Sequence, residues 1–177
     1  MPSKIVNIIG GGLAGCETAY QLSKKGIKSN LYEMRPLVNT EVHKTSLLAE
    51  LVCSNSFRSD DFNHNAVGVL HQELRMSDSL IMKAADFCKI PAGTALAVDR
   101  IKFSKYIDKV IKNNKNIRFI NKKINSLDQF KNTIVVIATG PLTAEKLLEN
   151  IKDLTKSDSL AFFDAIAPIV YADTIDM

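Results

Sequence analysis

Residues 8–15 read "IIGGGLAG" and place three glycines directly after an apolar run. The run Ile5–Ile9 is β-branched except for Asn7, which predicts a strand buried on both faces of a parallel sheet. Apolar residues at helical spacing follow as far as Gly26, and Ile27–Glu33 predicts a second strand. The glycines therefore occupy the turn of a strand–helix–strand unit.

The glycine turn has the G-x-G-x-x-G spacing of dinucleotide-binding proteins. The first glycine makes the tight turn, the second lets a pyrophosphate approach the backbone, and the third lets helix and strand pack closely. Free N–H groups at the start of the helix favour the phosphates. A turn needed only for packing would explain Gly15, but not three consecutive glycines. The candidate cofactor-binding residues of the turn are Gly10, Gly11, Gly12, Leu13, Ala14 and Gly15.

Glu33 ends the predicted second strand, 18 residues beyond Gly15. An acidic side chain at this position accepts hydrogen bonds from a ribose hydroxyl, so Glu33 joins the cofactor-binding candidates. It also disfavours an adenosine cofactor that carries a 2′-phosphate. A surface charge at the end of a strand is the alternative interpretation.

Length and composition fit a globular protein. The chain has 177 residues, 46% hydrophobic and 24% charged, enough for one domain or one domain with an insertion. No apolar run is long enough to span a membrane and no secretory leader is evident, so we expect a cytoplasmic protein. Cys16, Cys53 and Cys88 are odd in number and form no C-x-x-C pair. This argues against a disulfide framework and against a zinc site, and we expect no metal.

The net charge of +4 identifies no partner by itself. Residues 98–116 predict an amphipathic helix with Phe103, Ile107 and Ile111 on its apolar face and lysines largely on the other. We interpret the lysines as a solvated face. A contribution to binding RNA phosphates is the alternative.

Short strands are predicted again over 117–120, more weakly over 122–125, and as a buried run over 133–140. The last run ends in the small residues Ala138, Thr139 and Gly140, which permit close approach of a dinucleotide to the backbone. Together with the N-terminal unit it favours FAD, with Thr139 and Gly140 as cofactor-binding residues. An ordinary buried strand followed by a turn is the alternative.

A further helix is predicted after this strand. Thr143 is expected to cap it, Glu145 to lie in its first turn, and the helix to run through Asn150.

Residues 34–98 do not continue the strand–helix alternation and are interpreted as an insertion. Cys53 lies there between apolar and polar neighbours. With Arg58, and with His43 if the fold brings it near, the Cys53 thiol is expected to have a lowered pKa and to be reactive. The alternative for Cys53, and the stronger interpretation for Cys16 and Cys88, is a small buried hydrophobic side chain.

Eight stretches resemble one family, the bacterial folate- and FAD-dependent tRNA (uracil-5-)-methyltransferases. In order along the chain they are "IIGGGLAGCETAYQLSKKGI", "LYEMRP", "AELVCSNSFRS", "NAVGVLHQELR", "SLIM", "PAGTALAVDR", "VIATGPLT" and "FFDAIAPIV". They span nearly the whole chain. "LVCSNSFRS" and "PAGTALAVDR" are far more specific than the glycine turn.

The resemblance implies an α/β fold, a Rossmann-like FAD-binding fold of the glutathione-reductase type with an inserted, mostly helical segment. Residues 1–33 would begin the FAD-binding domain, 34–98 form the insertion with Cys53, 99–155 continue the domain, and 156–177 start a further segment. Arg35, in "LYEMRP", joins the cofactor-binding candidates.

The resemblance also implies a reaction. Members are thought to reduce FAD with NAD(P)H, take a methylene group from methylenetetrahydrofolate, and deliver it to carbon 5 of a uridine in the tRNA T-loop. Uracil carbon 5 becomes nucleophilic once a thiolate adds at carbon 6. Cys53 stands where the family has one of its two functional cysteines, so it is the expected catalytic residue. Its role could be to assist transfer at the flavin, to act as a base or to bond to an intermediate.

Members of the family are more than twice as long as this chain. We therefore interpret the chain as a truncated or split gene product. If the gene is split, a second polypeptide is expected to supply the missing half. A ribosomal RNA uridine is an alternative substrate, and an inactive nucleotide-binding fragment is an alternative of another class. A generic NAD-dependent oxidoreductase would explain the glycine turn and Glu33, but not "LVCSNSFRS".

Overall fold

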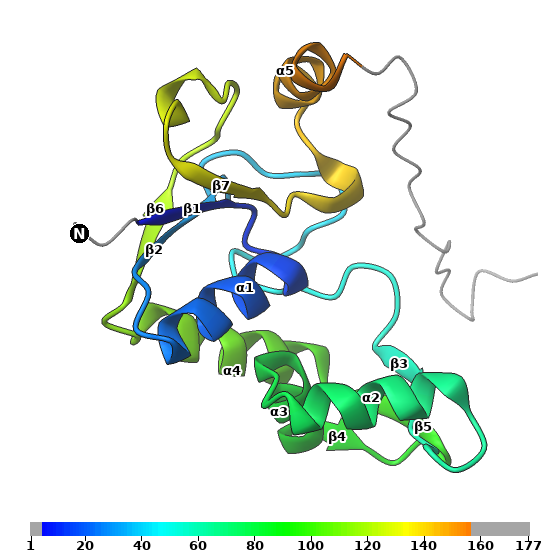
Figure 1. The fold of residues 1–177 in the computed structure, drawn as a ribbon. Coiled ribbons are helices and arrows are strands. Elements are labelled where there is room, and N and C mark those ends of the chain that lie inside the picture. The colour runs from blue at the N-terminus through cyan, green and yellow to red at the C-terminus, as the bar shows by residue number, and fades with distance from the viewer. Residues whose placement is uncertain (1–4, 157–177) are drawn as a thin grey trace, which may run out of the picture.

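The computed structural model describes residues 5–156 of the chain. Its central element is a four-stranded parallel sheet with the strand order β6-β2-β1-β7 (Figure 1). The strands are β1 (Val6–Ile9), β2 (Ser29–Glu33), β6 (Ile117–Asn121) and β7 (Ile134–Ile137). The chain moves outward from β1 through β2 to β6 and then returns to the other side of β1, which is the order of a dinucleotide-binding sheet. The predicted Rossmann-like α/β fold is confirmed.

Helices cover both faces of this sheet. In Figure 1, α1 (Leu13–Lys24) and α4 (Arg100–Lys112) lie below it and α5 (Glu145–Thr155) lies above it. Successive residues of a strand point to opposite faces. Ile8 accordingly packs in the larger apolar cluster with residues of α1 and α4, while Ile9 packs in a smaller cluster with Leu147 of α5. The core is thus divided by the sheet into two parts.

The segment between β2 and α4 holds two helices and a second sheet. The helices are α2 (Ala66–Met76) and α3 (Leu80–Phe87), each capped by a side chain that precedes it. The sheet is antiparallel, in the order β3-β5-β4, with strands β3 (Ser56–Ser59), β4 (Lys89–Ile90) and β5 (Ala95–Val98). Sequence reasoning predicted the helical patches and missed these short strands. The three boundaries of the expected division of the chain, after residues 33, 98 and 155, stay predictions.

The strand predicted over 122–125 is wrong. β6 ends at Asn121, and Ile124 beyond it is buried in the smaller apolar cluster with Phe130. The Lys122 amide donates to the Glu33 carbonyl at 2.9 Å, so the chain leaves the sheet at the end of β2. A short 3₁₀ turn, η1 (Asp128–Phe130), follows.

The cap predicted for the last helix is also wrong, because the Thr143 hydroxyl donates to the Gly140 carbonyl at 2.7 Å in the 3₁₀ turn η2 (Gly140–Leu142). α5 begins after Ala144, with no side-chain cap, and extends beyond Asn150 to Thr155. Packing of Leu147 and Ile151 in the smaller cluster accounts for the greater length. Glu145 lies in the first turn, as predicted.

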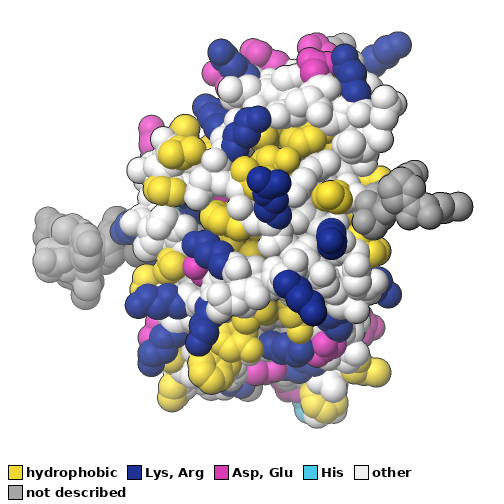
Figure 2. Space-filling model, turned by 90° about the vertical axis from the view of Figure 1, so that its left-hand side faces the viewer, with side chains coloured by type: hydrophobic (Ala, Val, Ile, Leu, Met, Phe, Trp, Pro, Cys, Tyr) yellow, Lys and Arg dark blue, Asp and Glu magenta, His cyan; other side chains and the backbone are white. Residues whose placement is uncertain are grey.

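The amphipathic helix predicted from residue 98 is confirmed as α4. The Asp99 carboxylate accepts from the Lys102 amide at 3.0 Å and caps the helix, whose apolar side chains Phe103, Ile107 and Ile111 are buried. Its lysines are exposed. On the face shown in Figure 2, Lys and Arg side chains are spread from top to bottom among exposed hydrophobic ones.

The predictions that fall on residues 157–177, including the stretch "FFDAIAPIV", lie outside the described residues. Among residues 5–156, no helix combines the length and the hydrophobicity needed to cross a membrane. Over the same range, no three His, Cys, Asp or Glu side chains are grouped so that they could hold a metal ion.

Candidate dinucleotide-binding site

A cavity of about 530 Å³ opens at the carboxyl ends of β1, β2 and β7, beside the first turn of α1. The order of the strands reverses at β1, and open α/β sheets bind their ligands at such a switch point. The volume lies in the range of small-molecule sites. The lining residues discussed below are Gly10, Gly11, Gly12, Leu13, Ala14, Glu33, Arg35, Thr40, His43, Glu50, Val52, Lys122, Lys123, Thr139 and Gly140.

Packing alone requires three of the glycines in the turn. A Cβ at Gly10 would lie 2.4 Å from the Ala138 carbonyl oxygen, and Gly10 has a φ of +108°. A Cβ at Gly15 would lie 1.9 Å from the Gly10 carbonyl oxygen, and one at Gly11 would lie 2.5 Å from Leu48 Cδ2. Helix, strand and loop are therefore in closest contact at these positions.

Gly12 differs from the other three glycines, because a Cβ there would meet no atom within 4 Å. Gly12 is the N-cap of α1, whose first intrahelical bond runs from the Cys16 amide to the Gly12 carbonyl at 3.0 Å. The amides of Leu13, Ala14 and Gly15 precede that bond and have no partner within the helix. The protein thus keeps open space at the end of a helix that attracts anions, which fits a bound pyrophosphate.

Glu33 closes the turn from the end of β2. Its Oε2 accepts from the Gly11 amide at 2.9 Å, and its Oε1 accepts from the backbone amide of Arg35 at 3.0 Å and from Arg35 Nε at 3.1 Å. Burial alone would raise the pKa of the Glu33 carboxyl, but the hydrogen bonds from Arg35 and Gly11 hold that pKa below its ordinary value. Glu33 is therefore a carboxylate at neutral pH.

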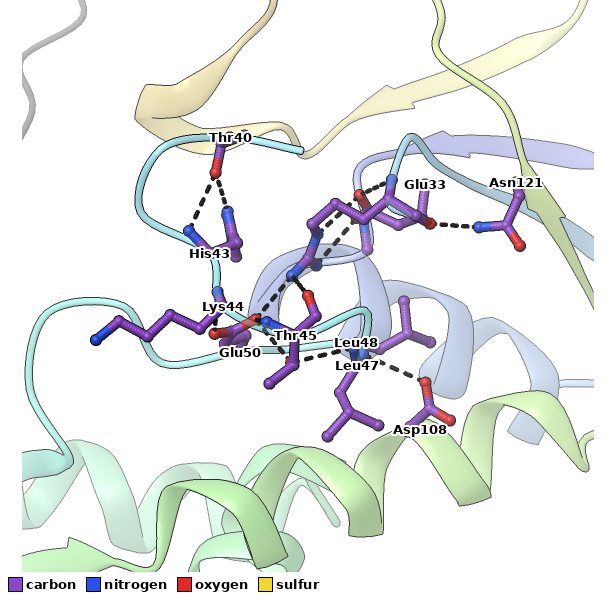
Figure 3. Close-up of polar contacts among 12 residues, drawn as sticks. Glu33, Thr40, His43, Lys44, Thr45, Leu47, Leu48, Glu50, Asp108 and Asn121 are labelled. Carbon is purple, nitrogen blue, oxygen red and sulfur yellow. Dashed lines mark hydrogen bonds and ion pairs between the residues drawn. The ribbon is translucent and has the colours of Figure 1, made fainter. Parts of the chain in front are cut away.

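Arg35 lies between two carboxylates, and its side chain is only 2% exposed. Opposite Glu33, its Nη1 donates to Glu50 Oε2 at 3.2 Å. Glu50 also accepts from the backbone amides of Lys44 and Thr45 and from the Thr45 hydroxyl (Figure 3). These bonds outweigh the burial of Glu50 and keep its pKa low. The structure thus places Arg35 in the wall of the cavity, with its guanidinium bound to protein groups.

Thr139 and Gly140 follow β7 and reach the cavity from the other side of β1. The Ala138 amide donates to the Ile9 carbonyl at 2.8 Å, which holds the end of β7 against β1. Gly140 has a φ of +63° and open space at its Cβ position. Nine of the ten residues predicted to bind the cofactor therefore line the cavity, while Gly15 does not and packs against Gly10 instead. Each keeps its cofactor-binding role as a prediction.

Cys53 is half-buried and lies just beyond the cavity, since its neighbour Val52 is among the lining residues and Cys53 is not. The Cys53 carbonyl accepts from Arg100 Nη2 at 3.0 Å, which ties it to the start of α4. The lowered thiol pKa expected from Arg58 and His43 stays a prediction. Burial raises the pKa of the Cys16 and Cys88 thiols, which agrees with their interpretation as buried small side chains.

The loop 40–50 contributes lining residues that sequence reasoning did not assign to the cofactor, namely Thr40, His43 and Glu50. His43 Nδ1 lies 2.6 Å from the Thr40 hydroxyl. Burial, and then the charge of Arg35, lower the pKa of the His43 imidazole. Glu50 stands in the stretch "AELVCSNSFRS", whose resemblance to the family pointed only to Cys53.

The family described as "Glucose inhibited division protein A" matches residues 5–177. The chain belongs to this family. Among solved structures, "Structure of Aquifex aeolicus GidA in the form II crystal" is similar with a TM-score of 0.54 and 19% identity, over 70% of this chain and 20% of that one. At that identity the likeness shows a shared fold and no more.

Several curated relatives carry the name "Methylenetetrahydrofolate--tRNA-(uracil-5-)-methyltransferase TrmFO". The protein of Bartonella henselae is 54% identical over 172 residues, which cover 97% of this chain and 36% of that protein. The protein of Rhodopseudomonas palustris is 54% identical over 175 residues, which cover 99% of this chain and 37% of that protein. The resemblance inferred from the motifs is confirmed. This member of the glucose inhibited division protein A family spans little more than a third of the length of those relatives.

Proposed function

We propose that this chain is the FAD-binding part of an RNA methyltransferase that makes 5-methyluridine in the tRNA T-loop. In this proposal methylenetetrahydrofolate donates the carbon and NAD(P)H reduces the FAD. The observation that carries the cofactor proposal is the open space at Gly12, at the N-terminus of α1 and within the cavity. The names of the curated relatives support the tRNA and the folate.

The residues present fit an FAD molecule. The pyrophosphate would lie at Gly12 and bind the amides of Leu13 and Ala14. Glu33 would accept from ribose hydroxyls, and such a hydroxyl would replace the longest contact of that carboxylate, from Arg35 Nη2 at 3.4 Å. Thr139 and Gly140 would approach the cofactor from the end of β7, while Arg35 would hold Glu33 in place. When bound, FAD supplies the redox chemistry of the reaction.

Cys53 is the proposed catalytic residue, on the strength of its motif. Its neighbour Val52 lines the cavity, so the Cys53 backbone lies within one residue of the cavity wall. The exposed Lys and Arg side chains of Figure 2 and the lysines Lys122 and Lys123 at the cavity provide positive charge for RNA phosphates. A second polypeptide supplying the rest of the RNA and folate surface is part of this proposal, as is a location in the cytoplasm, where bacterial tRNA is found.

A second candidate is a nucleotide-binding unit without chemistry of its own. It is favoured by one observation: residues of this chain line the cavity, and Cys53 is not among them. A uridine of ribosomal RNA is a further candidate substrate, because it would require the same carbon donor and the same flavin.

The cofactor proposal is tested by titrating the purified 177-residue chain with FAD and, separately, with NAD, followed by gel filtration and an absorption spectrum. One FAD retained per chain, with a flavin band and no retention of NAD, is the expected result. Retention of NAD without FAD would favour the generic oxidoreductase and refute the proposal.

The substrate proposal is tested in cells that lack the gene. Mass spectrometry of nuclease fragments from tRNA and from ribosomal RNA would locate the missing methyl group. Its loss from the tRNA T-loop is expected. A T-loop that keeps its methyl group while a ribosomal uridine loses one would assign the activity to ribosomal RNA, and no change in either RNA would leave the chain as a binding unit.

A further inference from the structure

The segment that carries Cys53 is attached directly to the glycine turn. We call residues 44–53 the cysteine segment. The Ala49 amide donates to the Gly11 carbonyl at 2.8 Å, while the Gly11 amide donates to Glu33 at 2.9 Å. The amide of Gly11 thus bonds to the carboxylate of Glu33, and the carbonyl of Gly11 bonds to the cysteine segment. The Leu48 side chain packs over the same glycine.

A chain of buried ion pairs makes a second connection. Glu33 binds Arg35, and Arg35 binds Glu50, whose side chain is 12% exposed. Glu50 gathers the start of the cysteine segment: Oε1 accepts from the Lys44 amide at 2.8 Å and Oε2 from the Thr45 hydroxyl at 2.8 Å. Charge-assisted hydrogen bonds of buried groups are the strong ones, so this cluster fixes the path of the segment (Figure 3).

The cysteine segment has a separate attachment to α4. The Leu48 amide donates to Asp108 at 3.3 Å, the Ser104 hydroxyl donates to the Ala49 carbonyl at 3.3 Å, and Arg100 binds the Cys53 carbonyl. If these bonds alone placed Cys53, the ion pairs of Arg35 would have only a local role. The ion-pair chain and the attachment to α4 can be separated by substitution, because they use different side chains.

We propose that the Glu33–Arg35–Glu50 chain couples occupancy of the cofactor cavity to the position of Cys53, with Arg35 and Glu50 as positioning residues. The inference rests on the proposed binding of FAD at this cavity. A ribose hydroxyl on Glu33 takes over part of the hydrogen bonding that Arg35 supplies in the free protein. The guanidinium is then bound more firmly to Glu50, and the cysteine segment is held more closely. The free and the cofactor-bound protein therefore present the thiol differently.

The test measures the rate at which iodoacetamide alkylates Cys53, with and without saturating FAD, by mass spectrometry of the peptide. Cys16 and Cys88 are buried and serve as slow internal references. The variants are Glu50→Gln and Arg35→Lys, which keep the size or the charge of the side chain but cannot bridge as the native pair does. The matched control is Glu41→Gln, the same chemical change at an exposed position in the preceding residues.

FAD is expected to change the wild-type Cys53 rate by at least about fivefold, the lower end of typical coupling between sites. With each variant saturated by FAD according to its own measured Kd, Glu50→Gln and Arg35→Lys should show a rate that FAD changes by less than about twofold. Glu41→Gln should behave like wild type. A Glu50→Gln variant that keeps the full effect of FAD on Cys53 would overturn the inference, since a merely structural role would leave that effect in place.

The ligand-free comparison separates this inference from the proposed function. If the wild-type chain binds no FAD, the proposed function fails for this chain, but the free Cys53 rate still decides the role of Glu50. That rate should differ between Glu50→Gln and Glu41→Gln by at least about threefold, because a charged hydrogen-bond acceptor of the segment is lost. Equal rates would refute the inference. If Glu50→Gln fails to fold, Thr45→Val removes one bond to Glu50 without unpairing a charge, and the same comparisons apply.

Discussion

The carbonyl oxygen of Gly10 occupies the space that a Cβ at Gly15 would need, at a distance of 1.9 Å. Backbone atoms of the strand end and of the helix meet there, and neither can move without separating α1 from β1. Gly12, three residues earlier, has no atom within 4 Å of its Cβ position. One turn therefore contains a glycine that the fold requires and a glycine that the fold does not explain.

Alanine should separate these two glycines. Gly15→Ala is expected to lower the free energy of unfolding by about 3 kcal/mol or more, because overpacking against backbone cannot be relieved by a side-chain rotation. Gly12→Ala should lower it by only about 1 kcal/mol, the cost of alanine at an N-cap. Urea unfolding followed by circular dichroism measures both. Similar losses for the two variants would show that the space at Gly12 is not open in solution.

Gly12→Val should fold and lose the cofactor. A branched side chain would occupy the place of the pyrophosphate, so Kd for FAD should rise by about 100-fold or more, equivalent to about 2.7 kcal/mol. The measurement is quenching of flavin fluorescence in a titration. Gly26→Ala, at the other end of α1, is the control and should bind FAD like wild type. Tight binding by Gly12→Val would place the pyrophosphate elsewhere.

Folding stability should decrease in acid in two stages. The pKa of His43 is lowered by burial and by Arg35, so the unfolded chain binds the proton first and stability falls as pH drops below 6.5. Glu33 and Glu50 also have lowered pKa values, so their contribution is complete above 4.5 and is lost as pH falls through their folded values. Urea unfolding between pH 8 and about pH 2.5 should show both stages.

Two variants assign these stages. His43→Gln should flatten the curve of stability against pH in the upper stage only, and Glu50→Gln should flatten it in the lower stage only. Curves that stay parallel to wild type would mean that other groups control the acid response.

The insertion should depend on Asp60 for its stability. The Asp60 carboxylate accepts from His71 Nδ1 at 3.0 Å and from Arg75 Nη2 at 2.9 Å, which joins the end of β3 to α2. Asp60→Ala should cost about 2–3 kcal/mol, less than a fully buried pair because Arg75 is partly exposed. The control is Asp128→Ala, which breaks an exposed ion pair with Lys131 and should not change the unfolding midpoint measurably.

Cys53→Ala should leave FAD binding unchanged in this chain, because Cys53 does not line the cavity. In a full-length relative, the alanine variant of the corresponding cysteine should retain flavin and lose RNA methylation, measured as 5-methyluridine in tRNA. Ser54→Ala, at the exposed neighbouring position, is the control. Full methylation by the cysteine variant would make Cys53 a structural residue.

Local signals explain how much of the fold could be predicted. The buried run before the glycines and the spacing of the glycines themselves lie within a few residues of the elements they define. The same holds for the apolar face of α4. These signals placed the parallel sheet and the turn at its carboxyl end, and hence most of the cavity.

The rest depends on contacts between residues far apart in the chain. β3 pairs with β5 at Ser56 and Ala97, in strands of four residues that are too short to show a pattern. Glu50 reaches Arg35 across a loop that has no periodicity, so nothing in the sequence indicated that it shares the wall of the cavity. The predicted cap at Thr143 is wrong for a local reason, because the Thr143 hydroxyl donates to the nearby Gly140 carbonyl instead.

The division of the core by the sheet has a consequence for how a ligand could leave. On the side of α5, four buried side chains, Ile9, Ile124, Phe130 and Leu147, seal the sheet, whereas the side of α1 and α4 holds a much larger cluster. Regions with fewer buried contacts open at lower free energy. The α5 side should therefore exchange its amide hydrogens first. Such a local opening would move Ile124 and Leu147, which line the cavity, while Ala138 at the end of β7 and the start of α1 stay packed on the larger cluster.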